Sequence, residues 1–380
     1  MRQKTGCGVA LAAALAFAIL PAAADMPAGT ISAFNQALQT GDAAVIVEAA
    51  KVLGANAVAH PEDRQAPVAA FEAANQLCLL NGCAEAVPMA GFLGGLDDAA
   101  LPVSRAEVEV LAAFAGWSAS AKDKAADAAF GDVLEANAGI SPSALTLAAY
   151  EYYCAAIIGS DDWKAVRRRA GLAGKHMMPV RDAVPYRWAT VALLSSSALF
   201  NDEQSTDALQ EVVDVETWLL GKRPSGQAGD TNRAYFRAMA WHRALMAYFR
   251  TAGGRDFKIA QKIDAKAEKA LEEAHPDGKA ESSETAPLCD GHVVSPPKPT
   301  YPRRAARKGY VGAVVLSFDF VDGEPANYRV LASVPDGEFE QVSLEGMRSF
   351  KWEWDQEQEN PDCTKSKTEV AIYPFEYILR

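Results

Sequence analysis

Histidine, cysteine and carboxylate side chains, which most often perform catalysis or bind metals, are widely spaced in this sequence. The histidines are His60, His176, His242, His275 and His292, and none lies at metal-ligand spacing from another histidine or a cysteine. The chain has no H-E-x-x-H motif, no G-x-S-x-G motif and no glycine pattern for binding phosphate. The sequence therefore predicts that the protein is not an enzyme. It indicates no catalytic residues, no metal site, no cofactor and no small-molecule substrate.

Charged side chains gather in short runs, and these favour structural roles. Asp161-Asp162 precede an expected helix, where carboxylates complement the helix dipole. For Arg167-Arg168-Arg169 we expect salt bridges on the polar face of that helix, with a docking patch for an acidic partner as the alternative. The acidic run from Glu353 to Glu359 lacks the spacing of an EF-hand loop, so we expect a solvated loop there.

The first residues, Met1–Ala24, have the pattern of a secretory signal peptide. Arg2 and Lys4 precede a short apolar stretch, and Ala22-Ala23-Ala24 forms a cleavage site before Asp25. We therefore expect export to the periplasm by a cleaved signal, with an uncleaved inner-membrane anchor as the alternative.

Export to an oxidising compartment makes disulfide bonds plausible. Cys78 and Cys83 flank a turn-like spacer and could form one bond, while Cys289 and Cys363 could connect the start of the C-terminal region to the acidic run. For Cys154 we expect a buried structural thiol. The predicted pairs are therefore Cys78 with Cys83 and Cys289 with Cys363.

Length and charge limit the class of protein. The chain has 380 residues, 49% of them hydrophobic, which suits a globular protein of two or three domains. Its formal net charge is −12. This acidic balance argues against binding to nucleic acid or to anionic membrane surfaces.

Residues 25–274 show helical periodicity almost throughout. Apolar residues recur at helical spacing in successive pairs of segments, at intervals of roughly forty residues. This pattern predicts an all-α helical-repeat domain that resembles tetratricopeptide proteins, with an irregular helical bundle as the alternative. A helical array of this kind would offer a concave surface to a partner.

Several helix boundaries can be predicted from single residues. Ser104 has the spacing of an N-terminal cap, and Ser141-Pro142 places proline where a first helical turn accepts it. Gly221 and Gly253 stand where a helix end favours a left-handed residue. The following residues, 275–297, are rich in proline, serine and acidic residues and predict an extended linker that joins two domains loosely.

The last segment, residues 298–380, has a different pattern. Strand-like alternation over Ala313–Phe320 places Val314, Leu316, Phe318 and Phe320 on one face, which predicts a half-buried strand. A second strand is expected over Tyr328–Ser333, and a third over Glu369–Leu379. Helices are expected over Tyr301–Lys308 and Phe339–Phe350, so the order of elements predicts a small α+β domain.

This segment resembles the C-terminal domain of the TonB family. The matching residues are Pro299, Tyr301, Pro302, Ala305, Gly309, Gly312, Ser333, Pro335, Gly337, Phe339, Arg348, Phe350, Lys351, Trp352, Phe375 and Tyr377. One departure is the acidic insertion Glu353–Lys367 before the final strand. The resemblance covers about the last eighty residues and nothing before them.

The resemblance implies a partner. TonB C-terminal domains bind outer-membrane transporters, and an extended peptide adds to the edge of their sheet. If the last strand is an edge, Val370, Ile372 and Phe375 lie near the docking surface, and Tyr301 is a further candidate. Pro374 would remove one backbone donor, as edge strands tolerate. In the alternative, this strand simply completes the core.

Three hypotheses follow for function. The first is a periplasmic protein of the cell envelope that binds other proteins, in connection with transmembrane transport. The second is a TonB-type energy transducer for uptake through outer-membrane receptors, held in the inner membrane by an uncleaved anchor. The third is an envelope enzyme that uses the helical domain, which would require a deep polar pocket.

Overall fold

The structure is a computed structural model that describes residues 26–120, 123–223, 227–274, 288–296, 299–321, 323–355 and 363–378. The expected signal peptide lies outside these residues. The chain forms two compact units, Met1–Ile158 with Lys175–Pro179, and Gly159–Gly174 with Val180–Arg380. No helix in the described part of the chain is both long and apolar enough to cross a membrane.

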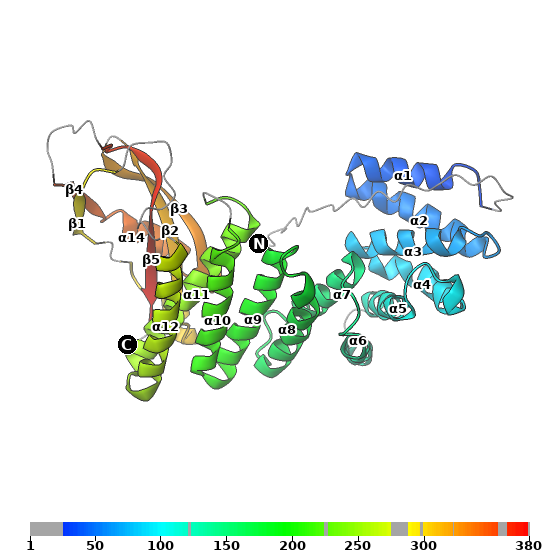
Figure 1. Cartoon of the computed structure of the whole chain (residues 1–380), viewed down its shortest axis with the longest axis horizontal. Coiled ribbons are helices and arrows are strands. Elements are labelled where there is room, and N and C mark those ends of the chain that lie inside the picture. The colour runs from blue at the N-terminus through cyan, green and yellow to red at the C-terminus, as the bar shows by residue number, and fades with distance from the viewer. Residues whose placement is uncertain are drawn as a thin grey trace. The chain divides into compact units, whose positions relative to one another are not determined.

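The first unit is helical, as its periodicity predicts (Figure 1). Its helices are α1 (Thr30–Thr40), α2 (Ala43–Ala59), α3 (Ala66–Leu79), α4 (Val87–Gly94), α5 (Arg105–Ala119), α6 (Lys124–Ala136) and α7 (Ala144–Ala155). Short 3-10 helices at Cys83–Ala86 and Asp98–Ala100 connect some of them. The most extensive contacts join consecutive helices, such as α1 with α2 and α2 with α3.

The observed helix ends agree only in part with the boundaries predicted from the sequence. The Ser104 hydroxyl accepts a hydrogen bond from the Glu107 backbone at 3.3 Å, and Gly253 ends α11 with a φ of 69°. The other two predictions were wrong. Gly221 has a φ of −75°, and α7 begins after Ser143, whose side chain caps the Thr146 backbone. Ser143 forms a full capping box with Thr146, which explains why Pro142 stays outside the helix.

Helix α8 (Trp163–Met177) runs through both units. The second unit continues with α9 (Pro185–Glu203), α10 (Thr206–Leu220), α11 (Asp230–Ala252) and α12 (Gly254–Ala274). Arg167 of α8 pairs with Glu203 at 3.2 Å, so the basic run is used at least partly for a salt bridge, as expected.

A buried histidine connects α10, α11 and α12. Nδ1 of His242 lies 2.7 Å from Glu216 Oε2, and its Nε2 lies 3.0 Å from Asp264 Oδ1. Burial alone lowers the pKa of His242, but the two carboxylates beside the ring outweigh it and raise the pKa to about 9. The charged imidazole therefore holds three helices together.

The C-terminal segment forms the expected α+β layer. The sheet has the order β3-β2-β5, with β2 (Gly312–Val321) antiparallel to both β3 (Glu324–Val334) and β5 (Lys367–Tyr377). Helices α13 (Arg303–Lys308) and α14 (Glu340–Met347) complete it. The predicted fold class, an all-α region followed by a small α+β domain, is confirmed.

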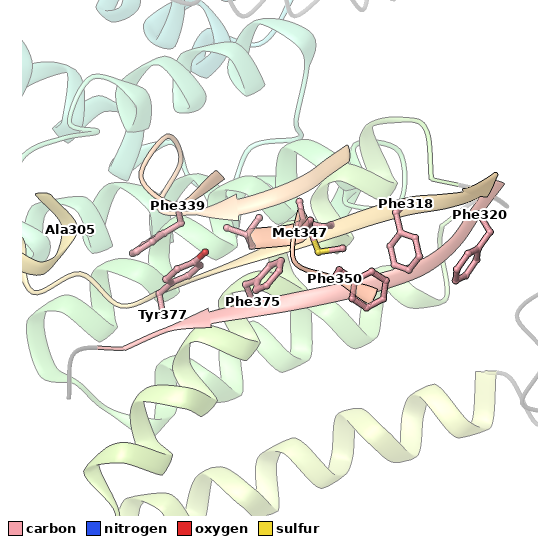
Figure 2. Close-up of a cluster of buried hydrophobic side chains, with 10 residues drawn as sticks. Ala305, Phe318, Phe320, Phe339, Met347, Phe350, Phe375 and Tyr377 are labelled. Carbon is pink, nitrogen blue, oxygen red and sulfur yellow. The ribbon is translucent and has the colours of Figure 1, made fainter. Parts of the chain in front are cut away.

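One face of this sheet carries an aromatic core. Its buried residues are Ala305, Val314, Leu316, Phe318, Phe320, Phe339, Met347, Phe350, Phe375 and Tyr377. Figure 2 shows the labelled rings gathered along one side of the strands. Tyr377 stacks on Phe339 with 4.3 Å between ring centroids, and its hydroxyl lies 2.6 Å from the Ser343 hydroxyl.

The opposite face of the sheet is covered by α11, which contacts β2, β3 and β5. The alternation of β2 predicts that Ala313, Val315, Ser317 and Asp319 face solvent, and this prediction was wrong. Each of the four is at most 3% exposed. The physical reason is that α11 packs on this face of the sheet, although the side chains there are small or polar.

The expected loose linker, residues 275–297, is partly folded. Residues 275–287 and 297 lie outside the described part of the chain, but β1 (Gly291–Ser295) pairs with β4 (Lys351–Trp354) as a separate two-stranded sheet. Since α11 also packs on the main sheet, the C-terminal domain is not loosely attached to α9–α12. The division at residue 274 is therefore not the boundary between the two compact units.

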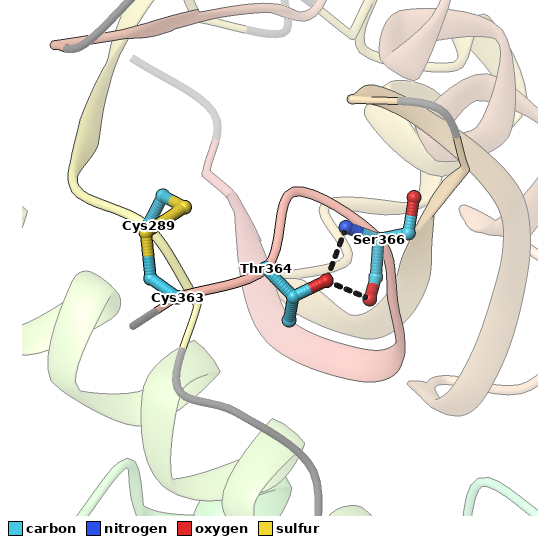
Figure 3. The surroundings of a disulfide bond; sticks show 4 residues. All are labelled: Cys289, Cys363, Thr364 and Ser366. Carbon is cyan, nitrogen blue, oxygen red and sulfur yellow. Dashed lines mark hydrogen bonds between the residues drawn. A yellow bond between two sulfur atoms is a disulfide. The ribbon is translucent and has the colours of Figure 1, made fainter. Parts of the chain in front are cut away.

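Both predicted disulfide bonds are present. Cys78 bonds to Cys83 and Cys289 bonds to Cys363, while Cys154 is buried and outside both bonds. Figure 3 shows the second bond beside Thr364, whose hydroxyl donates to the Ser366 carbonyl at 2.9 Å. The Cys289 backbone also donates to the Thr364 carbonyl at 3.0 Å. The bond thus attaches β1 to the segment that leads into β5.

Removal of the Cys289–Cys363 bond should destabilise the second unit. The two cysteines are separated by 74 residues, so the bond restricts a long loop of the unfolded chain. For Cys289→Ser with Cys363→Ser we expect a loss of about 2 to 4 kcal/mol in the free energy of unfolding. Urea unfolding under oxidising conditions measures this loss. The double variant Cys78→Ser with Cys83→Ser is the control, and a larger loss there would contradict the loop argument.

Candidate functional site

The outer edge of β5 is the best candidate for binding a partner. Among the described residues, β5 pairs with β2 alone, so its second edge faces no other strand. Its register with β2 is unbroken from Ala371 to Tyr377. A regular, unpaired edge presents backbone donors and acceptors to which another strand can add.

The register shows which backbone groups point outward. Val321 and Glu324 pair across a two-residue connection, and the closing pair of such a hairpin exchanges backbone hydrogen bonds. Because bonding direction alternates along a strand, odd-numbered residues of β2 bond to β3 and even-numbered residues bond to β5. The backbones of Ile372, Pro374 and Glu376, which pair with odd-numbered residues of β2, therefore point away from it.

The other edge of the sheet is irregular. The pairing of β3 with β2 shifts twice, once between Val315 and Leu316 and once between Ser317 and Asp319. Asn327 of β3 also has a φ of 53°, which is uncommon for a residue with a side chain. Bulges of this kind bend a strand and protect an edge from unwanted pairing. Strand β3 is therefore a poorer template than β5.

Side chains of β5 point alternately to the two faces of the sheet. Glu376 points to the helical face, where its Oε2 lies 2.6 Å from Nη2 of Arg250 at the end of α11. Phe375 points to the aromatic core and is 5% exposed. Long-range pairing of Arg250 with Glu376 has no signal in the sequence, and it places a charged helix residue beside the candidate edge.

The four predicted partner-binding residues occupy different environments. Ile372 has an outward backbone on β5, and Val370 lies where the register of β5 is irregular. Phe375 is in the core with its backbone toward β2, so it does not form part of the outer edge. Tyr301 donates its hydroxyl to the Tyr310 carbonyl, and burial raises the pKa of its phenol. That these residues bind a partner stays a prediction.

An ion pair between a buried carboxylate and a partly exposed arginine joins the strands on the face of the sheet that α11 covers. Arg329 of β3 makes two hydrogen bonds to Asp319 of β2, at 2.5 and 3.1 Å, and the Glu369 backbone donates to the same carboxylate at 2.8 Å. The hydrogen bonds from Arg329 lower the pKa of Asp319 to about 2. The Asp319 carboxylate thus joins all three strands, and the Arg329 guanidinium balances its charge.

The described residues hold no group of three or more metal-binding side chains. A depression of about 390 Å³ beside α14 is lined by Thr300, Val342, Glu345, Gly346, Arg348 and Ser349. Both charged residues of this depression are exposed. The Glu216–His242–Asp264 cluster lies between helices with its charges satisfied by one another. The edge of β5 therefore remains the feature best suited to a molecular function.

Comparison with known proteins identifies the C-terminal segment. Residues 297–379 match the family model described as Gram-negative bacterial TonB protein C-terminal. No curated protein and no solved structure matches the chain. Domains of this family interact with outer-membrane proteins, which indicates a role at the cell envelope. Residues 297–379 are therefore a TonB C-terminal domain, attached here to an α-helical region.

Proposed function

We propose that this chain is a periplasmic, non-enzymatic interaction protein that binds an extended segment of another envelope protein along β5. The observation that carries the proposal is the unbroken register of β5 with β2 from Ala371 to Tyr377, at an edge with no neighbouring strand among the described residues. An outer-membrane transporter is the partner that the TonB match favours. Backbone hydrogen bonds would hold the segment, and side chains on both faces would select it.

The helical region has a part in this proposal. Helix α11 covers the second face of the sheet and positions Arg250 beside β5. The strand therefore has a packed layer on each face, which keeps the edge straight and ordered before a partner arrives. Such preorganisation reduces the entropy lost on binding. The remaining helices would bind a second envelope protein.

Crosslinking in living cells tests the proposal. A photoreactive residue at position 372 lies on β5 and would be adjacent to an added strand, whereas one at Val330 lies on β3, where the valine is 36% exposed. We expect position 372 to capture an envelope protein and position 330 to capture none. Equal capture from both positions, or capture of no envelope protein from position 372, would refute strand addition at β5.

A proline variant supplies a second measurement. Ile372→Pro removes one outward donor without removing a bond to β2, because the backbone of this residue points away from β2. We expect about tenfold weaker capture of the partner, because one intermolecular hydrogen bond is lost. Unchanged capture would count against backbone pairing.

The TonB match also supports energy transduction as a second candidate. In that case the first residues stay attached and anchor the chain in the inner membrane. The intact mass of protein recovered from fractionated cells separates the two candidates. A periplasmic form that begins at Asp25 excludes the anchored transducer, and a membrane-bound form that retains Met1–Ala24 excludes the cleaved periplasmic protein.

A further inference from the structure

Pro374 lies at the centre of the outward edge of β5 and has no backbone N–H to donate. We propose that Pro374 guards this edge against pairing with a second copy of the chain while leaving it open to a foreign strand. The second half of this inference rests on the proposed function of β5. The first half concerns the edge itself and can be tested without a partner.

The number of missing backbone donors differs between pairing with a foreign strand and pairing with a second copy. When a foreign strand pairs along Ile372–Glu376, it finds one position without a donor, and the carbonyl of Pro374 still accepts. When two β5 edges pair, each copy brings its own Pro374, so the ladder lacks two donors in every register that includes both prolines. If the two prolines lie opposite each other, no hydrogen bond forms between them.

The free-energy cost of the missing donors is therefore about twice as large when two β5 edges pair as when a foreign strand pairs with β5. A buried carbonyl without a donor loses its bond to water and gains none from protein. One missing donor corresponds to about a tenfold weaker complex, so two correspond to about a hundredfold. The proline thus lowers affinity for any strand but discriminates against the identical one.

The rest of the edge explains why such a guard is useful. Strand β3 is protected by two shifts of register and by the left-handed Asn327. Strand β5 has no such shift between Ala371 and Tyr377, and a regular edge is always complementary to a copy of itself about a twofold axis. The net charge of −12 repels copies in general, but it does not distinguish one edge from another.

Restoring the donor tests the proposal. Sedimentation velocity of the full chain over a concentration series measures self-association of wild type, Pro374→Ala and Pro374→Thr. We expect both variants to dimerise about a hundredfold more tightly than wild type, because each copy regains a donor. Cooperative thermal unfolding of each variant verifies that it is folded, and threonine additionally suits a strand.

Pro325 provides a matched control. Its nitrogen also points outward, because its neighbour Glu324 bonds to β2, but it lies on the bulged strand β3. We expect Pro325→Ala to leave self-association unchanged. Adding Ile372→Pro to Pro374→Ala should return self-association to the wild-type level, because each copy then again lacks one outward donor of β5.

The outcomes separate this inference from the proposed function. Folded Pro374 variants that associate no more than wild type would overturn it, even if position 372 captures an envelope protein. A dimer that persists with Ile372→Pro, or that forms equally with Pro325→Ala, would overturn it as well. Dimers formed through β5 support the guard even where no envelope partner is captured, and in that case only the proposed function fails.

Discussion

Replacing Val315 with aspartate should unfold the second compact unit or reduce its free energy of unfolding by more than about 4 kcal/mol. Val315 is fully buried on the face of β2 that α11 covers. The substitution removes a packed side chain and places a charge where neither water nor a positive partner is provided. Urea unfolding monitored by tryptophan fluorescence measures the loss.

Val321→Asp is the control, because Val321 lies on the same strand but is 44% exposed. We expect it to change the free energy of unfolding by less than about 1 kcal/mol, because the new carboxylate is exposed and its main cost is repulsion from Glu324 on the opposite strand. The comparison distinguishes the structure from the sequence pattern, which predicts that residue 315 faces solvent. Similar stability of the two variants would mean that α11 does not cover this face in solution.

Replacing His242 with glutamine should also have a large effect. The His242 side chain is 3% exposed and lies between Glu216 and Asp264, so its loss leaves two partly buried carboxylates without this positive charge. The pKa of His242 is raised from 6.5 to about 9. This difference corresponds to about 3 kcal/mol of stability, within the range for breaking a buried ion pair.

The effect should depend on pH in a defined direction. Because folding raises the pKa of His242, its contribution is complete below the unfolded value of 6.5 and is lost as pH rises through about 9. The hydrogen bond from His242 lowers the pKa of Asp264 from 3.8, so that contribution is present above 3.8 and is lost as pH falls further. The free energies of unfolding of wild type and His242→Gln should therefore differ most between pH 3.8 and pH 6.5. Thermal unfolding across this range measures the difference.

His292→Gln is the control for the pH series. Nδ1 of His292 lies 2.8 Å from Asp355, but its side chain is 60% exposed. Exposed ion pairs contribute little, so we expect a change below about 0.5 kcal/mol at every pH. If His242→Gln shows the same flat profile, the buried histidine does not carry a charge in the folded protein.

Local patterns predicted most elements of this fold. Helical spacing located the helices of residues 25–274, and alternation located β2 and β3. A run of β-branched and aromatic residues located β5. Each of these signals depends on neighbours within a few residues. Strands β1 and β4 were missed. Gly291–Ser295 lies in a stretch whose composition resembles a linker, and β4 lies where the acidic insertion begins. Their pairing joins residues far apart in the chain, and one sequence alone does not show which distant segments pair.

The helical face of the sheet shows a second limit of sequence patterns. Asp319 and Ser317 indicate an exposed surface, since charged and hydroxyl side chains are seldom buried. In the structure, Arg329 bonds to Asp319 and lies within 3.4 Å of Ser317, so the polar groups are satisfied beneath α11. For the candidate site, the sequence left open whether the last strand is an edge or completes the core, and the order β3-β2-β5 places it at the edge of the sheet. It could not show that Phe375 faces the core or that Arg250 lies beside Glu376.

The contact between α11 and the sheet also determines how the protein would respond to tension. A strand bound along β5 and pulled along its own axis loads the hydrogen bonds of the ladder in shear, so they must break together. That load passes from β5 to β2, and from the covered face of the sheet to α11, with Arg250 and Glu376 as a direct connection. Helix α11 and the sheet would therefore share the pull, and the sheet would not carry it alone.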